Sequence, residues 1–132
     1  MKNNTPKVEY GDTEFEDSEY SRYNKYTKKY NYWKATTLYA YIKKQKLQSF
    51  DVPIASLPLD YLPFTVNNLD DFVYQCKRVK NTDLKYPIVL DSLGTIADGY
   101  HRLAKALLAG DKTIKAYRLQ EMPKPDRTEE DK

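Results

Sequence analysis

The sequence predicts an α+β domain in which helices pack against a small mixed sheet. Residues 86–119 alternate between short apolar strands and an amphipathic helix. Residues 69–80 repeat apolar side chains at helical spacing. The chain has 132 residues, of which 40% are hydrophobic, so it can bury one modest core and not two.

Charge and composition divide the chain into four parts. We expect an acidic flexible arm over 1–19, a Tyr/Lys-rich helical segment over 20–49, a folded domain over 50–120 and a charged, frayed tail over 121–132. The net charge is −4 for residues 1–20, +9 for 21–120 and −2 for 121–132. The basic body favours a phosphorylated, nucleic-acid or acidic protein partner, although a solvated lysine surface explains it equally well.

Composition also excludes several classes of protein. One cysteine and one histidine allow neither a disulfide framework nor a zinc cluster. The sequence has no apolar run of about 18 residues and no hydrophobic signal segment, so we expect no membrane association and a cytoplasmic location.

Aromatic and basic residues are interleaved after residue 20. Tyr20, Tyr23, Tyr26, Tyr30 and Trp33 recur at spacings of three and four, which predicts one face of a helix. A groove for single-stranded nucleic acid uses the same alternation of stacking and basic side chains. The candidate nucleic-acid or partner surface comprises Lys25, Tyr26, Lys28, Lys29 and Tyr30. The alternative is an amphipathic helix whose tyrosines pack on the body.

The middle of the chain should contain a second and a third helix. We expect a helix over 37–48, a short strand over 50–57 and a loop or turn over 58–66. Asn67 or Asn68 can cap a helix over 69–80. The apolar stripe of that helix, which includes Cys76, should be buried, so we expect an inert buried thiol.

The last third contains the strongest local signals. Residues 87–90 and 95–97 should form a hairpin around the turn at 91–94. A helix over 100–109 follows, with Gly110 ending it in a left-handed conformation, and a strand over 113–119 closes the domain.

The corner between the second hairpin strand and this helix is the candidate site. It reads Asp98-Gly99-Tyr100-His101-Arg102. Backbone N–H groups at a helix N-terminus lack intrahelical partners, and the helix dipole favours an anion there. Gly99 permits a close approach, Arg102 offers a planar fork for phosphate oxygens, and His101 can donate a hydrogen bond or carry a proton. All five residues can equally be ordinary cap, turn and core residues.

Residues 86–119, YPIVLDSLGTIADGYHRLAKALLAGDKTIKAYRL, resemble the ParB/sulfiredoxin superfamily. Residues 51–57 and the helix over 69–80 are similar to the first strand and helix of that family, so the resemblance covers about residues 50–119. It implies a ParB/sulfiredoxin-like fold and a nucleotide, such as ATP or CTP with Mg²⁺, bound at the DGYHR corner.

The resemblance implies several activities, and the sequence departs from each pattern. Tyr100 stands where sulfiredoxins have their nucleophilic cysteine, and Arg102 alone represents the arginine-rich box of the ParB proteins. The free serine kinases carry a similar Asp-Gly-His-His-Arg segment but use an upstream glutamate as base. No glutamate occurs between Glu19 and Glu121, and Asp60 is the nearest substitute. The resemblance therefore implies His101 and Asp60 as catalytic candidates, with Asp98 and Asp60 as candidates to recruit Mg²⁺.

Three functions remain open from the sequence. The first is a domain that binds a nucleotide or phosphate group at the DGYHR corner, with or without phosphotransfer or nucleotide hydrolysis. The second is a nucleic-acid-binding module that uses the Tyr/Lys surface. The third is a non-enzymatic, protein-binding accessory factor of the phage or mobile-element type.

Overall fold

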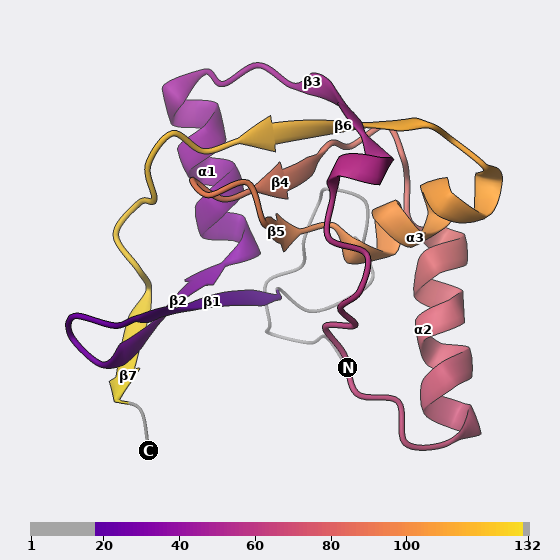
Figure 1. Cartoon of the computed structure of the whole chain (residues 1–132), viewed down its shortest axis with the longest axis horizontal. Coiled ribbons are helices and arrows are strands. Elements are labelled where there is room, and N and C mark those ends of the chain that lie inside the picture. Colours follow the sequence, from indigo (N-terminus) through magenta and orange to yellow (C-terminus); the bar gives the residue numbers. More distant parts are fainter. Residues whose placement is uncertain (1–17, 131–132) are drawn as a thin grey trace, which may run out of the picture.

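The computed structural model describes residues 18–130, which form an α+β fold with three α-helices and two small sheets (Figure 1). None of the helices in this range combines the length and apolarity that a membrane span needs. The elements in chain order are β1 (Glu19–Asn24), β2 (Lys29–Lys34), α1 (Ala35–Gln45), β3 (Phe50–Pro53), the 3₁₀ helix η1 (Ile54–Ser56), α2 (Leu69–Asn81), β4 (Ile88–Leu90), β5 (Ile96–Asp98), α3 (Tyr100–Ala109), β6 (Thr113–Arg118) and β7 (Arg127–Glu130).

The larger sheet has the strand order β3-β6-β4-β5 and is mixed. β4 runs parallel to β6, whereas β3–β6 and β4–β5 pair antiparallel. Successive side chains of a strand point to opposite faces, and β4 is buried along its whole length. Ile88 and Leu90 belong to one core with Leu103 of α3, whereas Val89 belongs to a second core with Leu38 of α1. The sheet is therefore covered on both faces, which explains the continuous apolar run of β4.

The smaller sheet has the order β1-β2-β7 and is antiparallel. We predicted a helical segment over residues 20–49, with Tyr20 to Trp33 on one face of a helix. That prediction was wrong for the first part of the segment, which forms the β1–β2 hairpin, and only α1 is helical. Tyr20 and Trp33 do lie side by side, with ring centroids 6.0 Å apart, but as cross-strand partners. Tyrosine favours strands, and the turn is built by Asn24, whose side-chain oxygen accepts from the Tyr26 and Thr27 amides.

The C-terminal segment is also more ordered than the sequence indicated. Residues 127–130 form β7, which pairs with β2, so the prediction of a frayed tail over 121–132 was wrong for this part. Asp126 accepts hydrogen bonds from the Lys34 amide at 2.8 Å and from Thr37 Oγ1 at 2.9 Å. It thus anchors the start of α1 from about 90 positions away in the chain. Of the predicted acidic arm, residues 1–17 lie outside the described residues.

The other predicted elements are largely confirmed. Asn68 caps α2 by accepting from the Asp71 amide at 2.9 Å, and Gly110 ends α3 with a φ of 77°. The strand predicted over 50–57 ends at Pro53 and continues as η1. The predicted burial of the α2 stripe was wrong: none of the helix is buried, and Cys76 is exposed. The single predicted sheet is in fact two sheets.

Candidate functional site

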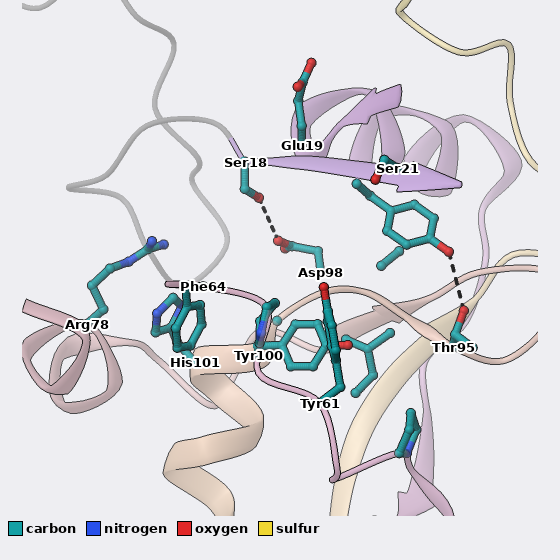
Figure 2. Close-up of a pocket in the computed structure, with 16 residues that line it drawn as sticks. Ser18, Glu19, Ser21, Tyr61, Phe64, Arg78, Thr95, Asp98, Tyr100 and His101 are labelled. Carbon is teal, nitrogen blue, oxygen red and sulfur yellow. Dashed lines mark hydrogen bonds between the residues drawn. The ribbon is translucent and has the colours of Figure 1, made fainter. Parts of the chain in front are cut away.

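A pocket of about 670 Å³ opens where β5 meets α3 (Figure 2). Five parts of the chain contribute to its wall: the start of β1, the loop before α2, α2 itself, β5 and the first turn of α3. The lining residues are Ser18, Glu19, Tyr20, Ser21, Pro58, Tyr61, Pro63, Phe64, Arg78, Thr95, Ile96, Ala97, Asp98, Gly99, Tyr100 and His101. The pocket thus combines aromatic walls with a helix N-terminus and a cationic side chain.

Gly99 shapes the floor of this pocket. It precedes α3 with a φ of 111°, a left-handed conformation that favours glycine. A Cβ at this position would lie 2.5 Å from Cγ2 of Ile88 and 2.8 Å from its Cβ. The first turn of α3 therefore lies directly against β4, and only glycine fits between them.

Arg102 does not line the pocket, contrary to the role that the sequence suggested for it. Its side chain is 1% exposed and lies beneath the first turn of α3. The guanidinium donates to Pro87 O at 2.6 Å, to Tyr39 Oη at 2.8 Å and to Asp98 Oδ2 at 2.7 Å. These contacts join α3 to α1, to the end of β5 and to the residue before β4, so the fork predicted for phosphate oxygens serves protein acceptors instead.

Asp98 lines the pocket, but both oxygens of its carboxylate already accept hydrogen bonds from other protein groups. Oδ2 accepts from Arg102 and from the Tyr39 hydroxyl at 2.8 Å, and Oδ1 accepts from the Ser18 hydroxyl at 3.1 Å. Burial and the neighbouring charge of Asp98 raise the pKa of Tyr39 above its ordinary value, so this phenol stays protonated as a donor. Asp98 therefore acts as an acceptor that ties the end of β5 to α1, to α3 and to the residue before β1.

His101 is buried on the pocket wall, with 6% of its surface exposed. Its Nε2 lies 2.7 Å from Oε1 of Gln75 on α2, and its ring stacks on Phe64 with centroids 4.8 Å apart and planes at 11°. Figure 2 shows the two rings face to face, with Arg78 beside them. The ring is thus fixed by α2 on one side and by the loop before α2 on the other.

Three important residues of the pocket were missed by the sequence analysis. Tyr61, Phe64 and Arg78 come from the loop and helix before the DGYHR corner, and only the fold brings them to it. Tyr61 packs edge-on against Tyr100, with ring centroids 6.0 Å apart. The sequence offered one signal for them, which is the presence of two aromatic residues in a proline-rich loop. A loop that only connects two elements through solvent seldom carries such side chains.

Asp91 holds β1 at the rim of the pocket. It is fully buried and accepts from the Tyr20 hydroxyl, from Thr95 Oγ1 at 2.6 Å and from the Leu93 and Thr95 amides, each at 2.9 Å. Burial alone would raise the pKa of Asp91, but the hydrogen bonds from Thr95 and Tyr20 outweigh it and hold the pKa below its ordinary value. The sequence suggested only a turn here.

The remaining candidates lie elsewhere. Asp60 is exposed and does not line the pocket, although its neighbour Tyr61 does. Lys25, Tyr26 and Lys28 lie in the turn of the β1–β2 hairpin, and Lys29 and Tyr30 begin β2. The DGYHR corner and the Tyr/Lys surface are therefore separate features.

We compared the chain with protein-family models, with curated proteins and with solved structures, and none of the three comparisons gave a match.

Proposed function

We propose that the pocket at the DGYHR corner binds a nucleotide or another phosphorylated ligand. The observation that carries the proposal is the meeting of Arg78, His101 and the N-terminal turn of α3 in one aromatic-walled pocket. Helix N-terminal amides and a guanidinium both favour an anion. Tyr61 and Tyr100 supply aromatic surface for a base, and about 670 Å³ is within the range of small-ligand pockets.

We further propose that residues 50–119 form a ParB/sulfiredoxin-like domain. The order β4, β5, glycine, α3, glycine and β6 is the order that the resemblance implies. The phosphate contacts of this protein, however, differ from those expected from the motif. Since Arg102 donates to protein acceptors, we assign the cationic role to Arg78 and the remaining contacts to the amides of Gly99, Tyr100 and His101.

The proposed function is binding without an assigned chemical step. Asp60, the nearest substitute for the base of the free serine kinases, is exposed and outside the pocket wall. Nε2 of His101 is held by Gln75 at 2.7 Å, which favours a positioning role for the ring. We therefore assign a catalytic step to neither Asp60 nor His101.

The residues of the pocket do not fit a protein-held magnesium ion. Mg²⁺ prefers carboxylate oxygens in near-octahedral geometry, and both oxygens of Asp98 accept hydrogen bonds from protein groups. Within residues 18–130, no group of three or more His, Cys, Asp or Glu residues is arranged to hold a metal ion.

Titration of the ¹⁵N-labelled protein with ATP, CTP and inorganic phosphate tests the proposal. We expect the amide resonances of Gly99, Tyr100 and His101 to shift, and Arg78→Ala to weaken binding about tenfold or more, as expected for loss of a charge-assisted hydrogen bond. Arg118→Ala, which removes an exposed arginine outside the pocket, is the matched control. The absence of any binding at millimolar ligand would refute the proposal.

A second candidate function is binding of single-stranded nucleic acid by the β1–β2 hairpin. Tyr26 is 86% exposed, with the Lys25 ammonium 5.4 Å from its ring centroid, and Tyr23 packs on Tyr30 at 5.1 Å. Residues 19–34 carry five bases and one acid. An exposed ring beside a cation is the arrangement on which bases stack.

Fluorescence anisotropy with a labelled single-stranded oligonucleotide tests this candidate. We expect binding that weakens steeply as salt is raised and that is lost when Lys25, Lys28 and Lys29 are all changed to Glu. The control with the same net charge changes Lys43, Lys44 and Lys46, at the end of α1, to Glu. Equal loss in both variants would mean that only the overall charge matters and would exclude the hairpin as the site.

A further inference from the structure

Helix α2 presents an apolar stripe to solvent. Leu69, Phe72, Val73 and Cys76 recur at helical spacing, and their exposed fractions are 74% for Leu69, 55% for Phe72 and 45% for Val73. The helix lies at the edge of the molecule, next to α3 (Figure 1). Apolar side chains in a continuous stripe on a helix are typical of a surface that another element covers.

Charge is distributed unevenly along the same helix. Its first turn holds Asp70 and Asp71, and its last two turns hold Lys77, Arg78 and Lys80. Asp70, Lys77 and Lys80 are exposed, as the apolar stripe is. The stripe thus has a negative end and a positive end.

We propose that a second copy of this chain covers the stripe, with the two α2 helices packed antiparallel about a two-fold axis. In this arrangement Asp70 of each copy lies opposite Lys77 and Lys80 of the other, so opposite charges meet at both ends. A parallel arrangement would place like charges together. The two-fold axis passes close to Val73 and Cys76, so each of these residues lies near the same residue of the second copy.

The size of the contact sets the expected affinity. We expect a contact made by one helix from each copy to be smaller than the roughly 1,200 Å² that marks the small end of stable interfaces. The dimer is therefore reversible, and its population rises with protein concentration. Sedimentation velocity over a concentration series measures this directly. A protein that stays monomeric up to millimolar concentration would overturn the proposal.

Substitutions within the apolar stripe of α2 test whether this stripe forms the dimer contact. Val73→Glu and Phe72→Asp each abolish the dimer, because they place charges in the apolar contact. Both side chains are exposed in the monomer, so the far-ultraviolet circular dichroism stays unchanged. Leu108→Glu is the matched control, since Leu108 is an 82% exposed apolar residue on α3. A dimer that survives both α2 substitutions uses another surface and contradicts the proposal.

A charge swap tests the antiparallel orientation. Asp70→Lys alone and Lys80→Asp alone each weaken the dimer about tenfold, because each creates two like-charge contacts across the axis. The double variant restores the dimer, since the pairs are again opposite in sign. Failure of the double variant to recover would exclude the antiparallel register.

Cys76 provides an independent readout, since it is the chain's only cysteine and lies close to the proposed axis. A short bis-maleimide crosslinker converts the wild-type dimer to a covalent dimer, and Val73→Glu prevents this. Crosslinking that is equally efficient in both proteins would reflect random collision and would count against the proposal.

Discussion

The guanidinium of Arg102 donates a 2.7 Å hydrogen bond to the carboxylate of Asp98, four residues earlier in the chain, and both groups anchor the first turn of α3. Further donation to Pro87 O and Tyr39 Oη links the same guanidinium to the residue before β4 and to α1. Asp98 and Arg102, the two ends of the DGYHR segment, thus hold the pocket floor in place. The three residues between them line the pocket.

Loss of the Arg102 side chain should destabilise the protein strongly. Arg102→Ala leaves the Asp98 carboxylate without its ionic partner beneath the pocket, and breaking a buried pair in this way costs about 3–5 kcal/mol. Urea unfolding measures the change. Lys115→Ala is the control, because it breaks an exposed pair with Asp51 and should cost no more than about 1 kcal/mol. Similar losses for the two variants would contradict the structural role of Arg102.

Gly99 and Gly110 should respond differently to alanine. Both have positive φ, 111° and 77°, so each substitution incurs the left-handed penalty of about 1–2 kcal/mol. Only at Gly99 does the new Cβ also meet Ile88, at 2.5 Å from Cγ2, whereas nothing lies within 4 Å at Gly110. We expect Gly99→Ala to lower the thermal midpoint clearly more than Gly110→Ala. Equal shifts would show that the contact with β4 is readily relieved.

Asp91 should make the free energy of unfolding depend on pH in the acidic range. Because its pKa in the folded protein lies below the ordinary 3.8, the folded state favours the carboxylate. This contribution is fully present above that ordinary value and is lost as pH falls through the lower, folded pKa. In urea unfolding between pH 2.5 and 7, we expect Asp91→Asn to be less stable near neutrality and to lose part of the acid dependence. An unchanged slope below pH 4 would contradict this role.

Asp126 should stabilise α1 although it lies far away in the chain. It accepts from the Lys34 amide and from Thr37 Oγ1, and α1 has no side-chain cap from its own N-cap residue. Asp126→Ala should lower the free energy of unfolding by about 1 kcal/mol, the usual net contribution of a hydrogen bond. Asp111→Ala, at an exposed position after α3, serves as the comparison. A loss no larger than that of the comparison variant would contradict this anchoring role of Asp126.

Elements whose signals are local were predictable from the sequence. Asn68 marks the start of α2 as its N-cap, and Gly110 marks the end of α3 as its C-cap. Both could be predicted because capping depends on a few neighbouring residues. The hairpin of β4 and β5 was predicted for the same reason. The β1–β2 hairpin was not predicted, because its aromatic residues recur along the chain at spacings of three and four, as on a helix face. The pairs that actually meet, Tyr20 with Trp33 and Tyr23 with Tyr30, lie on opposite strands.

Features that depend on distant residues could not be predicted. Cys76 belongs to an apolar stripe, but only the arrangement of α2 against α3 decides which face of the helix stays exposed. The role of Arg102 depended similarly on Tyr39, which lies 63 positions away and offers its hydroxyl oxygen as a partner. Spacing along a chain carries no information about such contacts.

By itself, the sequence determined the mixed sheet around β4 and β6 and the three helices of the described residues. Tertiary structure alone decided that Arg102 faces inward, that Arg78, Tyr61 and Phe64 join the pocket and that β7 completes a second sheet. The physical reason is that helix periods and caps arise within a few residues. The partner of a buried charge or a strand edge, by contrast, depends on which distant segments the folded chain brings together.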